Sequence, residues 1–269
     1  MHKRVCLHQV ALIREKTADF VSFCREIGVV HMTLATPVLM QPGETEAAIK
    51  AMEGGETHVA VVNHPIAMGT DLERAGQEEA DKLIGAVEIA ATLGANAIYL
   101  VSGGRGSLSW EEAAERFCTL IGHLRDLADA KGVRLLVEPA MGFNSDMHIA
   151  HTLDDTIKLA EMAEIGVCID LQQIWFESAL EEKFRRAMPT TGLVQVSDYV
   201  YGDKCTPCRA VPGDGVIPLE RLIGDILDMG YKGVFDLELV GPRIEKEGTR
   251  SACKRSAENL SEILVRLGA

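Results

Sequence analysis

The sequence predicts an α/β protein, a (β/α)₈ TIM barrel formed as a single domain over residues 1–269. Short apolar, β-branched runs alternate with longer amphipathic runs along the whole chain. Eight such pairs in 269 residues give about 34 residues per unit, the repeat length expected of this barrel. A doubly wound open sheet is the alternative, but no Gly-x-Gly-x-x-Gly follows the first apolar run.

The predicted strands are short and apolar on both faces, as a parallel sheet covered by helices requires. A glycine stands near the start of several of them, where the preceding helix would end. The eight predicted strands are Val5–Gln9, Val29–Leu34, His58–Asn63, Ala97–Ser102, Arg134–Glu138, Gly166–Asp170, Leu193–Ser197 and Gly233–Glu238.

Amphipathic runs between these strands predict the helices. Ser109-Trp-Glu-Glu112 has the spacing of a capping box, in which serine and glutamate satisfy each other's backbone N–H groups, and it marks one helix start. The predicted helices are Thr17–Ile27, Glu44–Glu53, Leu72–Leu93, Trp110–Ala130, Leu153–Ala163, Phe176–Ala187, Leu219–Met229 and Thr249–Leu267.

The composition excludes several classes of protein. With 47% hydrophobic and 25% charged residues, the chain is expected to be globular rather than disordered. Its 27 basic and 40 acidic side chains give a net charge of −13. This balance argues against a nucleic-acid partner, because phosphate backbones attract clustered lysine and arginine.

Membrane and secretory signals are not expected either. The most apolar stretch, Leu83–Val101, is interrupted by Glu88 and by a Gly-Ala-Asn turn. Arg4 and Arg14 interrupt the apolar stretch near the N-terminus, so no signal peptide is predicted. Seven scattered cysteines do not form a disulfide framework, and we expect a cytoplasmic, reducing location.

Four consecutive predicted strands carry oxygen-bearing side chains near their C-terminal ends. In a parallel barrel, these ends meet at one rim, where catalytic groups gather. Buried carboxylates are costly without a compensating charge, and glutamate, aspartate and glutamine oxygens suit a hard ion such as Mg²⁺ or Mn²⁺. The predicted metal ligands are Glu138, Asp170, Gln195 and Glu238.

A second interpretation of these acids needs no metal. Some of them could form ordinary ion pairs with Arg134, Arg209 or Lys232. Asp236, next to the last of the four, could equally face the helices and is left out of the predicted site.

These residues resemble those of the sugar phosphate isomerase/epimerase superfamily, the xylose-isomerase-like TIM barrels. The resemblance covers the whole chain and is clearest over Leu135–Leu239. It implies one Mn²⁺, Mg²⁺ or Co²⁺ held by a Glu after strand five, an Asp after strand six, a His on strand seven and a Glu after strand eight. Arg209-Ala-Val-Pro-Gly-Asp-Gly215 is similar to the family's Arg-x-x-Pro-Gly-acid-Gly segment, whose arginine approaches the substrate.

The chain departs from the family pattern at two positions. Gln195 replaces the usual metal-binding histidine of strand seven, and Gln173 replaces the substrate-contacting histidine of the Asp-x-x-His motif. An amide oxygen still binds a hard ion but suits Zn²⁺ less well than imidazole does, which favours Mg²⁺ or Mn²⁺. Gln173 can donate a hydrogen bond to a substrate hydroxyl but cannot carry a proton.

The resemblance implies a metal-dependent isomerase or epimerase acting next to a carbonyl of a sugar-like or keto-polyol substrate, through a metal-stabilised enediolate. Glu138 and Glu238 would be its acid/base pair, although both could be ligands alone. A dehydratase of an inosose- or dehydroshikimate-like substrate would use the same groups. A nuclease resembling endonuclease IV is disfavoured by the charge, and a barrel without catalysis is the remaining alternative. Family members are often dimers or tetramers, so a homo-oligomer is possible.

Other polar residues are weaker candidates. His8 and His64 are predicted to contact substrate, whereas His148 and His151 are predicted to be solvated loop residues. A Gly-Gly-Arg-Gly segment after strand four matches neither a Walker loop nor a dinucleotide fingerprint. A single Cys-x-x-Cys, beginning at Cys205, lacks the second pair that a structural zinc site needs and is expected to line the pocket.

Overall fold

A computed structural model describes residues 1–67 and 70–269 of the chain. Its strands β1 to β8 form a closed barrel in chain order, and the strand pairs are parallel, which confirms the predicted fold class. Contacts divide the chain into two compact units, residues 1–60 with 193–269 and residues 61–192, and each unit is described by itself. That residues 1–269 form one domain stays a prediction.

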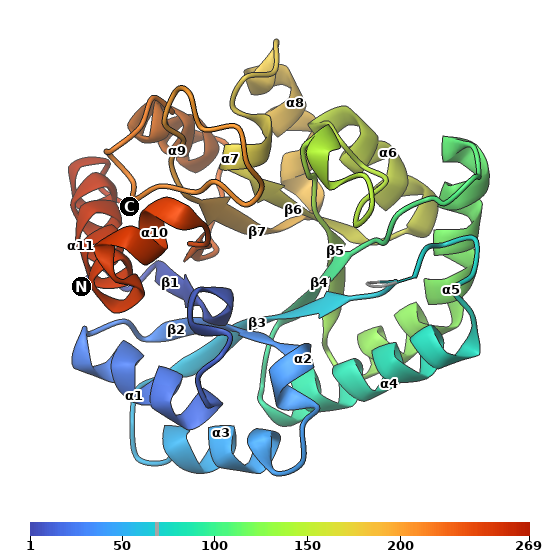
Figure 1. The fold of residues 1–269 in the computed structure, drawn as a ribbon, viewed down its shortest axis with the longest axis horizontal. Helices are drawn as coiled ribbons and strands as arrows, with labels where there is room; N and C mark the ends of the chain where they lie inside the picture. The colour runs from blue at the N-terminus through green and yellow to red at the C-terminus, as the bar shows by residue number, and fades with distance from the viewer. Residues whose placement is uncertain (68–69) are drawn as a thin grey trace. The chain divides into compact units, whose positions relative to one another are not determined.

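The first unit contains both termini. Within it, β1 pairs with β2 and β8, and β7 pairs with β8, while α1 lies beside α3 and α10 beside α11 (Figure 1). Strands β3 (His58–Pro65) and β7 (Thr191–Val196) each cross the boundary between the units. The other elements of this unit are β1 (Val5–His8), η1 (Gln9–Leu12), α1 (Thr17–Glu26), β2 (His31–Ala35), α2 (Thr36–Leu39), α3 (Glu44–Met52), α9 (Leu219–Asp228), β8 (Phe235–Leu237), α10 (Pro242–Glu247) and α11 (Thr249–Arg266).

The second unit is built on β4, which pairs with β3 and β5, and on β5, which pairs with β6. The helices α4 and α5 lie side by side along it (Figure 1). Its elements are α4 (Gln77–Thr92), β4 (Ala97–Val101), α5 (Trp110–Ala130), β5 (Arg134–Val137), η2 (Gly142–Asn144), α6 (Leu153–Ala163), β6 (Gly166–Asp170), α7 (Leu171–Ile174), α8 (Leu180–Ala187) and η3 (Met188–Thr190).

Each strand is short and buried because both of its faces are covered. All five residues of β4 and all five of β6 are buried, although successive side chains point to opposite faces. The helices cover the outer face with apolar side chains, for example Phe117 on α5 and Phe184 on α8, both fully buried. This is the two-sided burial expected of a parallel sheet.

Two predicted helices begin later than the sequence pattern indicates. Helix α4 begins at Gln77 rather than Leu72, because extended Gly76 takes the N-cap position and its N–H donates to the Glu79 carboxylate at 2.8 Å. Helix α8 begins at Leu180 rather than Phe176, after Ala179 in a left-handed conformation. Apolar periodicity alone therefore placed these starts four or five residues early.

Two observations concern membrane-spanning helices and cysteine pairing. Among the helices of residues 1–67 and 70–269, none combines the length and apolar character needed to cross a membrane. All seven cysteines carry free thiols, in line with the expected lack of a disulfide framework.

The capping box at the start of α5 gives a stability test. Ser109 Oγ accepts the Glu112 N–H at 3.2 Å, and the Glu112 carboxylate accepts the Ser109 N–H at 2.8 Å. We expect Ser109→Ala to lower the free energy of unfolding by about 1 kcal/mol. Urea titration measures this. The matched control is Ser22→Ala, which removes an exposed serine that donates within α1 to the Ala18 carbonyl. Equal effects of the two changes would contradict the capping role.

Candidate metal centre

In the second unit, two carboxylates stand where consecutive strands end. Glu138 directly follows β5 and is 6% exposed, and Asp170 is the last residue of β6 and fully buried. Asp170 Oδ1 accepts the Gln172 N–H at 3.0 Å and so caps the short helix α7. The strand therefore ends on a side chain that also begins the next helix, which fixes the carboxylate at the strand end.

His148 lies against the first of these carboxylates, contrary to the prediction of a solvated loop histidine. It is 5% exposed, and its Nε2 is 3.7 Å from Glu138 Oε1. Burial, and then the neighbouring His151, lower the pKa of His148 to about 3. At neutral pH the imidazole is therefore uncharged, so His148 is a polar neighbour of Glu138 and not its counter-ion. His151 is half-buried, and its Nδ1 lies 2.8 Å from the Ala140 carbonyl oxygen.

Gln173, a predicted substrate contact, has one end of its amide engaged. Its Oε1 accepts the Met141 N–H at 2.7 Å, which ties α7 to the loop after β5. The side chain is 7% exposed, and the group that it can offer to a ligand is the amide N–H.

In the first unit, Glu238 directly follows β8 and is held by two donors. Gln195, in β7, donates from Nε2 to Glu238 Oε2 at 2.7 Å. Arg209 Nη2 lies 3.2 Å from the same oxygen. The ion pair that the sequence allowed as an alternative is thus present for Glu238, and Arg209 and Gln195 together stabilise its negative charge.

The arginine predicted to approach a substrate is buried rather than extended into solvent. Arg209 is 5% exposed, and its Nη1 donates to Ser197 Oγ at 3.1 Å. Its orientation is therefore set by a serine at the end of β7 and by Glu238.

Two histidines predicted to contact substrate are buried at strand ends. His8, the last residue of β1, accepts the Val10 N–H at Nδ1 over 2.9 Å, so its neutral ring carries the proton on Nε2. His64, in β3, is 2% exposed. Burial, and then the charge of Lys82, lower the pKa of His64 to about 4. His64 is therefore neutral at physiological pH.

Asp236 is a polar residue of this end of β8 that the sequence argument left out. It is fully buried, and desolvation raises its pKa. In a strand, residues two apart share a face, so Asp236 lies on the same face as Glu238 and not toward the helices. The alternation of side chains along a strand would have been enough to predict this placement from the sequence.

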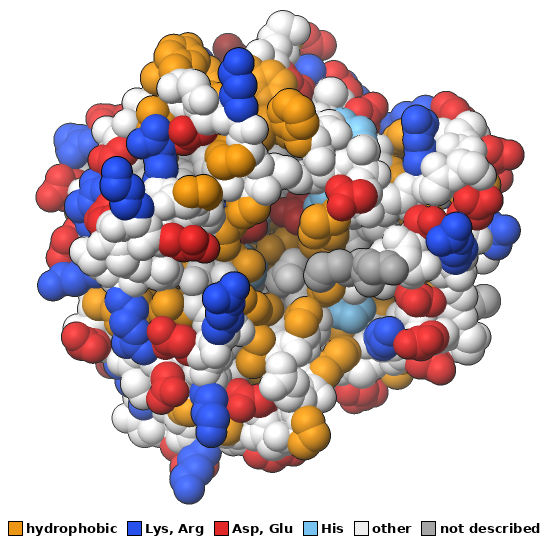
Figure 2. All heavy atoms as spheres, viewed as in Figure 1, with side chains coloured by type: hydrophobic (Ala, Val, Ile, Leu, Met, Phe, Trp, Pro, Cys, Tyr) orange, Lys and Arg blue, Asp and Glu red, His pale blue; other side chains and the backbone are white. Residues whose placement is uncertain are grey.

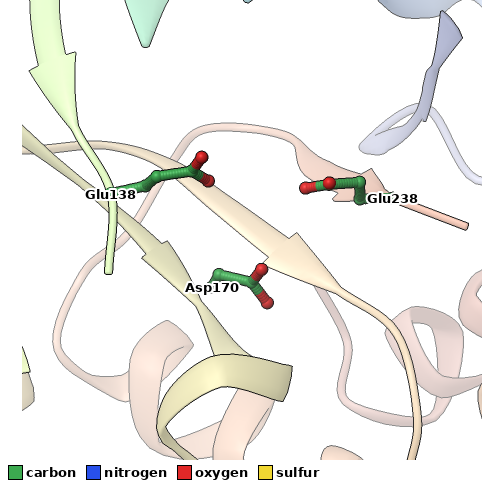
Figure 3. Close-up of side chains that lie close together, drawn as sticks. All are labelled: Glu138, Asp170 and Glu238. Atoms are coloured by element: carbon green, nitrogen blue, oxygen red, sulfur yellow. The ribbon is translucent and has the colours of Figure 1, made fainter. Parts of the chain in front are cut away.

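Glu138, Asp170 and Glu238 together could hold a metal ion. Each offers one carboxylate oxygen, and these oxygens all lie within 4.8 Å of one another. Figure 3 shows the three carboxylates as sticks. Three anionic groups at this spacing need a positive charge between them, and an all-oxygen donor set suits a hard divalent cation. The residues present therefore fit a metal site.

The chain belongs to the xylose isomerase-like TIM barrel family, whose model matches residues 7–260. The family resemblance read from the sequence is therefore confirmed. Comparison with curated proteins finds no match.

Several solved structures share the fold. Protein SMc04130 from Sinorhizobium meliloti 1021 matches with a TM-score of 0.85 at 22% identity, over 98% of both chains. The IOLI protein with a bound zinc atom matches with a TM-score of 0.82 at 15% identity, over 98% of both chains. D-psicose 3-epimerase with D-tagatose, from Clostridium cellulolyticum H10, matches with a TM-score of 0.79 at 14% identity, also over 98% of both. At these identities the likeness shows a shared fold.

The buried neutral state of His64 predicts a pH dependence of stability. In the unfolded chain the imidazole takes up a proton below its ordinary pKa near 6.5, whereas the folded chain keeps it neutral down to about 4. The unfolded state then binds more protons, so the free energy of unfolding falls as pH drops from about 6.5 toward 4, by up to about 1.4 kcal/mol per pH unit from this residue.

Urea titrations between pH 7 and pH 4.5 measure this slope. His64→Gln should show a shallower decline than the unaltered protein, and His2→Gln, at the half-buried second residue of the chain, should not. Equal slopes for the His64 variant and the unaltered protein would contradict the assignment.

Proposed function

We propose that the protein is a divalent-metal-dependent isomerase or epimerase that moves a proton next to the carbonyl of a polyhydroxylated substrate. The observation that carries this proposal is the cluster of Glu138, Asp170 and Glu238 oxygens within 4.8 Å of one another. Membership of the xylose isomerase-like family and the likeness to D-psicose 3-epimerase support the same reaction class.

The metal in this proposal is Mn²⁺ or Mg²⁺, held by Glu138, Asp170, Gln195 and Glu238. Gln195 lies beside this cluster, since its amide nitrogen donates to Glu238 Oε2 at 2.7 Å, and its amide oxygen would be the ligand atom. Four oxygen donors match the preference of these hard ions. The IOLI protein carries zinc, but the amide at position 195 makes the donor set of this chain harder than one with histidine.

The two glutamates move the proton in the proposed reaction. When bound, the ion would polarise the substrate carbonyl and so acidify the adjacent C–H bond. Glu238 is held as a carboxylate by Arg209 and Gln195, as a proton acceptor must be. Glu138 stands beside neutral His148 and is the second proton carrier, which an epimerase needs to return the proton on the other face.

Neutral and cationic donors would orient the hydroxyl groups of the substrate. His8 carries its proton on Nε2, His64 is neutral, and Gln173 offers an amide N–H. Arg209 adds a guanidinium beside Glu238. Such donors match hydroxyl and carbonyl oxygens, so the proposed partner is a small sugar-like or keto-polyol molecule.

Nucleic acid and membranes are not proposed as partners. On the face shown in Figure 2, lysine and arginine side chains are interspersed with aspartate and glutamate rather than gathered into a basic patch. A cytoplasmic location stays a prediction that rests on the free cysteines, and a homo-oligomer stays a prediction of the family resemblance.

Metal binding tests the cluster directly. We expect the protein to bind about one Mn²⁺ per chain, measured by isothermal titration calorimetry. Asp170→Asn should weaken binding at least about tenfold, because removing even a neighbour of a ligand has effects of this size. Asp154→Asn, on the exposed side of α6 in the same unit, is the matched control and should bind as the unaltered protein does. Unchanged affinity in Asp170→Asn would rule out this residue as a ligand.

Isotope exchange tests the chemistry. In D₂O with Mn²⁺, the protein should introduce deuterium next to the carbonyl of a ketohexose or inosose, followed by mass spectrometry and NMR. Glu138→Gln and Glu238→Gln should each reduce turnover by about 10²–10⁴-fold, because the amide cannot carry the proton. Glu161→Gln, an exposed substitution of the same kind on α6, should leave turnover unchanged.

The products separate the two candidate reactions. An isomer of unchanged mass indicates isomerisation or epimerisation, whereas loss of water indicates the dehydratase alternative. Full turnover by both Glu-to-Gln variants at positions 138 and 238 would reject the proton-transfer mechanism. Retention of metal with no exchange on any probe would favour the barrel without catalysis.

A further inference from the structure

The loop that follows β7 is fastened to one buried carboxylate. Asp198 is 1% exposed, and its oxygens accept four backbone N–H groups. Oδ1 accepts from Tyr199 at 2.8 Å and Ile217 at 3.1 Å, and Oδ2 accepts from Gly213 at 2.9 Å and Gly215 at 3.0 Å. One side chain therefore satisfies donors spread over residues 199–217.

The backbone of the same residue holds the other end of this loop. Asp198 N–H donates to the Ala210 carbonyl at 2.9 Å, and Ala210 N–H donates back to the Asp198 carbonyl at 2.8 Å. The fit is close: a Cβ atom on Gly215 would lie 2.2 Å from the Tyr199 carbonyl oxygen and 2.3 Å from Asp198 Oδ1. Only glycine at position 215 allows the loop to lie this near the carboxylate.

The fastened loop carries Arg209. Its backbone N–H donates to the Val240 carbonyl at 3.1 Å, just beyond β8, and Ala210 next to it is in the bridge to Asp198. From this backbone position, the guanidinium reaches Ser197 Oγ and Glu238 Oε2. The distance between Arg209 and Glu238 is thus set by a loop whose course depends on Asp198.

We propose that Asp198 is a positioning residue, which fixes the loop of residues 209–217 and thereby holds Arg209 against Glu238. The negative charge is part of the function, since hydrogen bonds to an ionised acceptor are stronger than neutral ones. An asparagine keeps the shape but has a single acceptor oxygen, and its NH₂ group would face two of the N–H donors. The consequence for turnover rests on the proposed function, whereas the positioning itself does not.

Two measurements that need no activity test the positioning. The first is amide hydrogen exchange of residues 209–217, followed by mass spectrometry. The second is modification of Arg209 by phenylglyoxal, a reagent for arginine. In Asp198→Asn, loop exchange and Arg209 modification should each rise about tenfold or more, the effect expected from losing hydrogen bonds to a buried charged acceptor.

Asp214→Asn is the matched control. Asp214 lies on the same loop, but its carboxylate is 44% exposed and pairs with Arg255 on α11, at 2.7 Å. This variant removes one of the two carboxylates that Arg255 pairs with and should leave Arg209 protected. Gly215→Ala is the second test variant: it keeps Asp198 but pushes the loop away, so it should reproduce the effect of Asp198→Asn.

Three results would overturn the proposal. The first is a faster-exchanging loop with Arg209 still protected, and the second is no change in either measurement. The third is faster exchange of β1 and β8 together with the loop, which would show general destabilisation and not positioning.

Turnover can be measured as a further test once isotope exchange has identified a substrate. Asp198→Asn should lower kcat about tenfold or more with a smaller change in KM, and Arg209→Ala/Asp198→Asn should be no slower than Arg209→Ala alone. An additional loss in the double variant would overturn action through Arg209. If the unaltered protein exchanges no substrate, the proposed function fails while loop exchange and arginine modification still decide the positioning.

Discussion

The mutual repulsion of three carboxylates is the constraint on which the polar chemistry of this protein depends. Oxygens of Glu138, Asp170 and Glu238 lie within 4.8 Å of one another. Two unit charges at this spacing repel by about 3 kcal/mol at an effective dielectric constant near 20. Arg209 contacts Glu238 and offers one positive charge. A divalent ion together with this guanidinium would balance the three negative charges.

Each of the two glutamines Gln195 and Gln173 has one end of its amide in a hydrogen bond. Gln195 donates to Glu238, and Gln173 accepts from the Met141 backbone. An imidazole can exchange protons with a substrate, but an amide cannot. At both positions the chain therefore has an amide, which can form hydrogen bonds but cannot carry a proton.

Much of the fold followed from the sequence, because two-sided burial makes strands such as β4 continuous apolar runs that periodicity detects. The acids at strand ends followed for the same reason: a charged residue that closes an apolar run is conspicuous. Short helices such as α2 and α10 were missed, since four to six residues are too few to show a helical period. His148 and Asp198 were missed because their partners are decided by how loops fold, with Asp198 binding N–H groups up to 19 residues away.

The Asp170 carboxylate has two roles: it is one of the three candidate metal ligands, and it caps the first turn of α7. Its Oδ1 caps α7 by accepting the Gln172 N–H. Gln173, in the same turn of α7, accepts the N–H of Met141 in the loop after β5. Replacing Asp170 would therefore remove one carboxylate of the cluster and the cap of α7 together, and α7 in turn holds the loop after β5 through Gln173.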